Sequence, residues 1–188
     1  MSSKELKESE INSVITLFSK GKFNEAFNIV TELTESFPDN PILHNIRGAC
    51  YAGLGQLTSA INSYKTAISL NPEYGKAYFN LGGAYHELGD YNNSVKSYEA
   101  SLSINPDYAE AFNNLGNVLS DSGMLEEAIH SFKEALVIKP DYVEASYSLG
   151  VILHEIGNLE DAVIAYQDAI KTNPNFSEAH NNLGNAYK

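Results

Sequence analysis

The stretch AEAFNNLGNVLSDSGMLEEAIHSFKEALVIKPDY, residues 109–142, decides the fold. Its first half places apolar residues three and four positions apart, as one face of an α-helix requires: Phe112, Leu115 and Leu119. Gly123 interrupts this pattern, and a second apolar face then runs to Pro140. Glycine can adopt φ > 0 and end a helix, and proline cannot continue one. The stretch therefore predicts two helices joined by a tight turn.

The same unit repeats every 34 residues along the chain. Two rows of residues keep this spacing: Pro38, Pro72, Pro106, Pro140 and Pro174, and Gly21, Gly55, Gly89, Gly123 and Gly157. A fixed period of this length is typical of stacked helical repeats. The predicted organisation is a disordered tail (1–6), a degenerate capping repeat (7–40), four full repeats (41–74, 75–108, 109–142, 143–176) and the first helix of an incomplete repeat (177–188).

A glycine recurs in the middle of each first helix, at Gly48, Gly82, Gly116, Gly150 and Gly184. Glycine inside a helix costs about 1 kcal/mol relative to alanine, so the recurrence needs a structural reason. We expect close approach of the two helices, with small residues such as Ala60 and Ala128 facing across. Large aromatic residues would then wedge against the next hairpin, namely Tyr64, Tyr98, Phe132 and Tyr166.

These residues resemble the tetratricopeptide-repeat (TPR) family. In 75–108 the resemblance rests on Tyr78, Leu81-Gly82, Tyr85, Gly89, Ser94, Tyr98, Ser101 and Pro106. It covers 41–188 well and 7–40 weakly, because Val14 replaces the mid-helix glycine. The repeats look like those of O-linked N-acetylglucosamine transferases and of bacterial multi-repeat proteins. The resemblance implies an all-α fold, a right-handed α-solenoid of stacked antiparallel hairpins, with the first helix of each repeat on the concave side.

Composition excludes several classes of function. The formal net charge of −12 disfavours nucleic acid, because affinity for phosphates depends on Lys and Arg. A single cysteine, Cys50, can form neither an internal disulfide nor a structural zinc site, which fits a reducing compartment. No apolar run is long enough for a signal peptide or a membrane span. We therefore expect a cytoplasmic protein without nucleic-acid or membrane partners.

The polar side of the first helices is the predicted peptide-binding site on the concave face. Asparagine, which offers both a donor and an acceptor to a peptide backbone, dominates it. The candidate residues are Asn45, Lys76, Asn80, His86, Asn113, Asn114, Asn117, Tyr147, Ser148, His154, Asn181, Asn182 and Asn185.

Asn80, Asn114 and Asn182 share one repeat position, with Ser148 interrupting the row. This row looks like the asparagine ladder with which the transferase repeats grip peptide backbones. Two alternatives are that the amides solvate the groove wall or that they bond to the neighbouring repeat. A clamp for acidic peptide tails is disfavoured, because Glu110 stands where a base would be needed.

Acidic residues become more frequent towards the C-terminal repeats. This gradient favours neutral or basic peptide partners, and the alternative is that it serves only solubility.

No residue pattern indicates catalysis, a metal or a cofactor. His86-Glu87 and His154-Glu155 lie two repeats apart, too far to share one ion, and no HExxH, GxSxG or phosphate-binding loop is present. Arg47 stands where the other repeats have leucine. It either reaches the groove or pairs with an acid of the first repeat.

The sequence thus predicts a non-catalytic protein–protein interaction scaffold. The alternative is the substrate-recruiting part of a larger enzyme of the glycosyltransferase, sulfotransferase or oxygenase type, truncated at Lys188. Because 177–188 lacks a partner helix, either the natural protein continues or this helix caps the stack. Self-association through its bare face is a third hypothesis.

Overall fold

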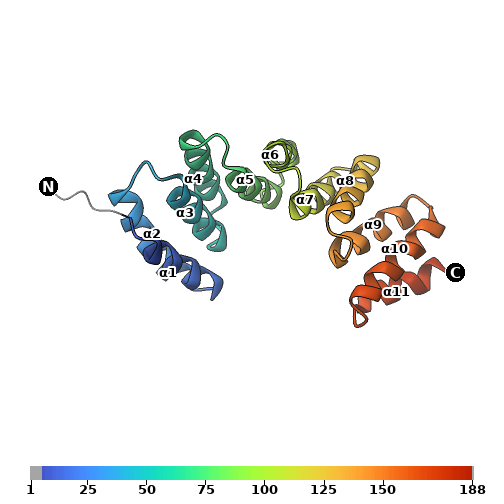
Figure 1. The fold of residues 1–188 in the computed structure, drawn as a ribbon. Coiled ribbons are helices and arrows are strands. Elements are labelled where there is room, and N and C mark those ends of the chain that lie inside the picture. Colours follow the sequence, from blue (N-terminus) through green and yellow to red (C-terminus); the bar gives the residue numbers. More distant parts are fainter. Residues whose placement is uncertain (1–5, 188) are drawn as a thin grey trace. The chain divides into compact units, whose positions relative to one another are not determined.

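The computed structural model describes residues 6–187, which form eleven α-helices and no strand (Figure 1). The chain divides into two compact units, residues 1–93 and 94–188, which are described separately. The first unit holds α1 (Glu8–Ser19), α2 (Phe23–Ser36), α3 (Pro41–Gly53), α4 (Leu57–Leu70), α5 (Gly75–Glu87) and the start of α6 (Tyr91–Ile104). The second holds the rest of α6, α7 (Ala109–Asp121), α8 (Leu125–Ile138), α9 (Val143–Glu155), α10 (Leu159–Thr172) and α11 (Ser177–Ala186).

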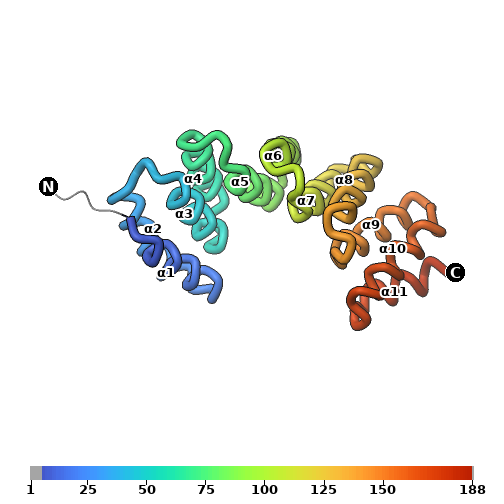
Figure 2. Tube along the Cα trace, viewed as in Figure 1, coloured from blue at the N-terminus to red at the C-terminus, as the bar shows by residue number. Residues whose placement is uncertain are grey.

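Within each unit, helices pair as antiparallel hairpins: α1 with α2 and α3 with α4 in the first, and α7 with α8 and α9 with α10 in the second (Figure 2). The glycines at the predicted turns all have positive φ, from 72° at Gly21 to 81° at Gly157. Only glycine adopts this conformation without strain, which explains why the turn position repeats so strictly. At the start of α3 the Asn40 side chain accepts hydrogen bonds from the backbone N–H groups of Ile42 and Leu43.

Most of the predicted tail lies outside the described residues, which begin at Leu6. Leu6 packs against the first core cluster. Each predicted 34-residue repeat contains one helix pair, and 177–188 contains α11. The repeat boundaries and the capping role of 7–40 stay predictions.

An aromatic ring fills the space beside three of the mid-helix glycines, Gly48, Gly116 and Gly150. A Cβ atom added to Gly48 would lie 2.5 Å from the Tyr64 ring, and one added to Gly116 would lie 2.7 Å from the Phe132 ring. The side chain that contacts the mid-helix glycine is therefore the aromatic residue of the same hairpin, and not the alanine that we predicted. Tyr64 also belongs to a buried cluster with Leu81 of the next hairpin, as the predicted wedge requires.

The first hairpin uses a different pair of residues at this contact. Val14 stands at the glycine position and Val30 at the aromatic position, and both are fully buried in one cluster. Two medium-sized side chains thus replace a very small and a very large one. Such volume-conserving exchanges are tolerated in close-packed cores.

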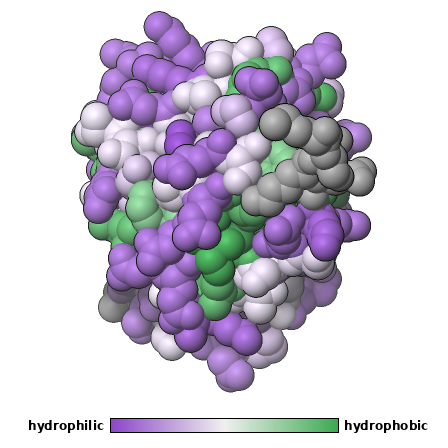
Figure 3. All heavy atoms as spheres, turned by 90° about the vertical axis from the view of Figure 1, so that its left-hand side faces the viewer, coloured by the Kyte–Doolittle hydropathy of each residue, from purple (hydrophilic) through white to green (hydrophobic). Residues whose placement is uncertain are grey.

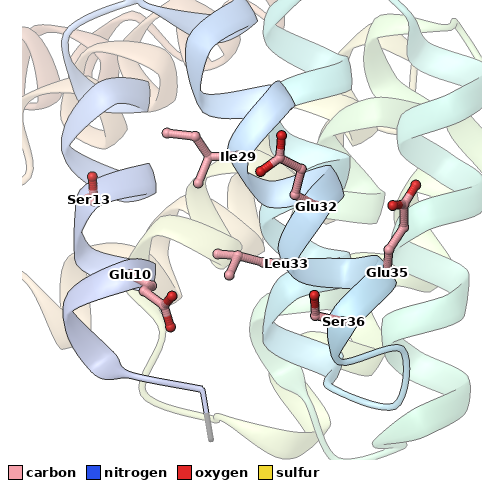
Figure 4. A pocket seen from close by; sticks show the side chains of 7 residues that line it. All are labelled: Glu10, Ser13, Ile29, Glu32, Leu33, Glu35 and Ser36. Atoms are coloured by element: carbon pink, nitrogen blue, oxygen red, sulfur yellow. The ribbon is translucent and has the colours of Figure 1, made fainter. Parts of the chain in front are cut away.

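A pocket of about 420 Å³ opens between α1 and α2. Figure 4 shows Glu10 and Ser13 extending from α1, with Ile29 and Leu33 of α2 facing the gap. Glu10 and Ser13 occupy positions at which the repeat 109–142 has Phe112 and Leu115. The surface of this side of the molecule is mostly hydrophilic, with a narrow apolar strip (Figure 3).

We predict that Gly116→Ala destabilises the protein by about 1–2 kcal/mol, because overpacking against Phe132 outweighs the gain in helix propensity. Gly184→Ala is the matched control, since nothing lies within 4 Å of its added Cβ. That variant should be stabilised by up to about 1 kcal/mol. Urea unfolding followed by circular dichroism measures both, and equal effects would contradict the assigned contact.

Burial raises the pKa of the Cys50 thiol to about 11. Cys50 is fully buried, and at pH 8 only about one thiol in a thousand would be the reactive thiolate. We predict that a disulfide reagent such as Ellman's reagent labels the native protein orders of magnitude more slowly than the protein in guanidinium chloride. Comparable rates would show that this part of the core is open.

Candidate peptide-binding face

The first helices of consecutive hairpins contact each other within each unit. In the first unit α3 contacts α1 and α5, and in the second α9 contacts α7 and α11. Residues at equivalent repeat positions therefore lie side by side on one face. We call these two faces the first-helix faces.

The predicted site residues differ in how accessible they are. Asn45 and Asn113 are buried, with exposed fractions of 7 % and 5 %. Lys76, Asn181 and Asn185 are exposed. The others are half-buried, namely Asn80, His86, Asn114, Asn117, Tyr147, Ser148, His154 and Asn182.

The asparagine row forms hydrogen bonds between repeats. Nδ2 of Asn80 donates to Oδ1 of Asn45 at 2.9 Å, and Nδ2 of Asn182 donates to the Tyr147 hydroxyl at 3.2 Å. In both pairs the residues are 35 positions apart, which joins one repeat to the preceding one. These bonds match the alternative in which the amides bond to the neighbouring repeat. Each amide retains hydrogen-bonding capacity beyond this bond.

Two asparagines of the row, Asn114 and Asn182, reach the wedge tyrosine of the preceding repeat. Asn114 hydrogen-bonds to Tyr98 and Asn182 to Tyr166. Burial raises the pKa of the Tyr98 hydroxyl to about 12, and the bond from Asn114 partly offsets this rise. Burial raises the pKa of Tyr166 in the same way, and the bond from Asn182 again opposes it.

The interruption of the row at Ser148 follows from this contact. The wedge residue before Ser148 is Phe132, which has no hydroxyl group to bond. The wedge residues before the three asparagines, Tyr64, Tyr98 and Tyr166, are all tyrosines. The sequence therefore contains a signal for this contact between neighbouring repeats. Sixteen residues after each wedge tyrosine stands an asparagine, and sixteen residues after the wedge phenylalanine stands a serine.

The missing asparagine leaves one buried acceptor without a partner. Oδ1 of Asn113 is buried and has no hydrogen bond, whereas Oδ1 of the equivalent Asn45 accepts from Asn80. The side chain of Asn113 donates one long bond of 3.4 Å to Asn114. A buried unpaired carbonyl is costly, so this position is a local weakness of the second unit.

Arg47 makes a contact that neither sequence alternative anticipated. Its Nη2 lies 3.1 Å from Nδ1 of His44, and Nε2 of His44 lies 2.6 Å from the carbonyl oxygen of Pro38. Arginine has only donors, so Nδ1 accepts and Nε2–H donates. His180 repeats the second contact, with Nε2 at 3.0 Å from the carbonyl oxygen of Pro174. These two histidines link α3 and α11 to the proline that precedes each of these helices.

The two predicted His-Glu pairs lie at the ends of α5 and α9, one in each unit. The His86 ring packs edge-on against Tyr91 at 5.9 Å in the first unit, and His154 lies on α9 in the second. Within residues 6–187 no group of three or more His, Cys, Asp or Glu side chains is arranged to hold a metal ion. No helix in that range is both long and apolar enough to cross a membrane.

The family model described as "TPR repeat" matches residues 48–89, 82–123, 116–157 and 152–188. The chain belongs to the TPR-repeat family. The predicted fold class, an all-α solenoid of stacked antiparallel hairpins, is thereby confirmed.

Solved TPR structures share this fold. The crystal structure of MamA superposes with a TM-score of 0.79 at 22 % identity, covering 93 % of this chain and 99 % of MamA. YrrB, described as a TPR protein with an unusual peptide-binding site, superposes with a TM-score of 0.74 at 22 % identity, covering 92 % and 89 %. Identities this low support the fold alone.

Two curated relatives match over shorter stretches. Small glutamine-rich tetratricopeptide repeat-containing protein 2 of Mycosarcoma maydis is 33 % identical over 75 residues, which cover 40 % of this chain. Hsp70-Hsp90 organizing protein 2 of Arabidopsis thaliana is 36 % identical over 59 residues, which cover 31 %. The matched stretches span only 20 % and 10 % of these two proteins.

A double-mutant cycle at Phe132 and Ser148 tests whether a wedge tyrosine and the asparagine sixteen residues later stabilise each other. Phe132→Tyr alone should cost about 1–3 kcal/mol, because it buries a hydroxyl group with no partner. Ser148→Asn alone should stabilise by about 1 kcal/mol by donating to Asn113. The double variant should be more stable than the sum of the two effects, as measured by urea unfolding. Strict additivity would contradict the proposed bond.

Proposed function

We propose that this chain is a non-catalytic protein-interaction scaffold whose first-helix faces bind an extended polypeptide. The observation that carries the proposal is the direct contact between consecutive first helices, which brings polar side chains at equivalent positions next to one another. In the second unit α7 carries Asn114 and Asn117, α11 carries Asn182 and Asn185, and both helices contact α9 between them.

Spare hydrogen-bonding capacity supports this role. Asn117 is half-buried, Asn185 is exposed, and the amide of neither forms a hydrogen bond within residues 6–187. Asn114 and Asn182, although bonded to the preceding repeat, keep further donors or acceptors. An amide can pair with backbone N–H and C=O groups whatever the side chains of the bound peptide. Such a face suits an extended peptide better than a folded surface.

The charge beside these amides favours a neutral or basic partner. Glu110, Glu144 and Glu178 occupy one position on α7, α9 and α11, and all three are exposed. A row of carboxylates would repel an acidic peptide and attract a basic one at low salt. The relatives fit a binding role in general terms, since one is named as an organizer of Hsp70 and Hsp90.

A selected peptide tests the proposal. A peptide of about twelve residues would be chosen from a random display library against the wild-type chain and titrated by fluorescence anisotropy. Replacing Asn117 and Asn185 together with alanine should weaken binding about tenfold, because two hydrogen bonds of about 0.5–1.5 kcal/mol each are lost.

The matched control replaces two exposed asparagines of second helices, Asn62 of α4 and Asn92 of α6. This variant should bind like the wild type. If both double variants bind equally well, peptides do not use the first-helix face of the second unit. An unchanged circular dichroism spectrum is required of both.

A further inference from the structure

A second candidate binding surface lies away from the asparagine row, between second helices. In the second unit a groove of about 510 Å³ runs between α6 and α8, with α7 as its floor. Its floor is apolar and contains Phe112, Leu115 and Leu119, and Met124 forms part of its wall. Met124 is 44 % exposed, although it is a large apolar side chain. This volume is in the range of pockets that hold ligands or anchoring side chains.

The rim of this groove is acidic. Glu99 of α6 and Glu126 and Glu127 of α8 line it, and all three are exposed. No lysine or arginine lines the groove, and none of these carboxylates forms an ion pair in the part of the chain that the structure describes. Glu126 and Glu127 lie in the first turn of α8, where the helix dipole stabilises negative charge, so their acidity has a local explanation. Glu99 lies in the middle of α6 and has no such reason.

The equivalent groove one repeat later shows that these features are not a general result of hairpin packing. It lies between α8 and α10 over α9, and its volume is only about 210 Å³. Lys133 stands there at the position of Glu99, and Ser146 stands at the position of Phe112. The same backbone arrangement thus carries a smaller opening, whose lining combines Lys133 with the carboxylates of Asp161 and Asp168.

We propose that the groove between α6 and α8 binds a short basic segment of a partner protein. One or two large apolar side chains of that segment enter between the helices, and its lysine or arginine residues pair with Glu99 and with Glu126 or Glu127. Charge complementarity selects this occupant, since an acidic segment would face three unpaired carboxylates. A second copy of this chain fits poorly, because it has 24 acidic and only 12 basic residues. This surface is separate from the proposed first-helix face, so one chain would hold two segments.

The experiment uses the full chain and a defined probe. The probe is a fluorescein-labelled peptide of about ten residues, built from lysine and leucine, and its binding is followed by anisotropy at about 0.1 M salt, where screening is moderate. Glu99→Lys should weaken binding at least tenfold. The variant should fold normally, because Lys65 and Lys133 occupy this position in the neighbouring repeats. Met124→Asn, which copies Asn158 of the next repeat, should weaken binding about threefold.

Glu160→Lys is the matched control. It changes the net charge by the same amount on an exposed position of α10, outside both grooves, and should leave affinity within twofold. The proposal is overturned if Glu99→Lys and Met124→Asn bind like the wild type. It is also overturned if Glu160→Lys weakens binding as much as Glu99→Lys, which would indicate bulk charge attraction. Equal binding of a probe with glutamate in place of lysine would overturn it as well.

Discussion

The contact between a glycine on one helix and an aromatic ring on its partner sets the geometry on which the rest of the structure depends. At Gly116 and Gly150 no side chain could be added without displacing the Phe132 or Tyr166 ring. The ring therefore lies directly against the backbone of the first helix. This contact recurs at a fixed interval, and consecutive first helices contact each other within each unit. In the first hairpin Val14 replaces the glycine and Val30 replaces the aromatic residue, so two side chains of similar size occupy these positions.

Polar links across the repeats follow from the same wedge residues. A tyrosine at the wedge position carries its hydroxyl group to the edge of the next hairpin, where an asparagine amide bonds to it in two cases. Burial without such a partner would cost free energy, so the two residue types occur together. Where Phe132 supplies no hydroxyl, Ser148 stands in place of asparagine and Asn113 loses its donor. The asparagine row thus has a structural role. The peptide binding proposed above uses the donors and acceptors of these amides that are not bonded to the neighbouring repeat.

The side chains on the proposed binding surfaces differ from repeat to repeat, although the backbone arrangement of the hairpins stays the same. Residues that hold the hairpin together, such as Gly116 and Phe132, face inward, so neighbouring positions are free to differ from repeat to repeat. The groove over α7 has Glu99 and Phe112 where the groove over α9 has Lys133 and Ser146. The two openings thus differ in charge and in size on the same framework. A repeat protein can therefore acquire a local binding site without altering its fold.

The sequence by itself determined the helix pairs, the turn glycines and the family, because each depends on local spacing that repeats at 34 residues. It also predicted which first-helix residues bind a peptide, and that assignment stays a prediction. Tertiary structure alone decided which ring fills the space at Gly48, why Asn45 and Asn113 are buried, and how Arg47 pairs with His44. Those outcomes depend on distances between side chains within one helix, within one hairpin and between neighbouring hairpins. The sequence pattern shows which residues recur, but only the tertiary structure determines which atoms are in contact.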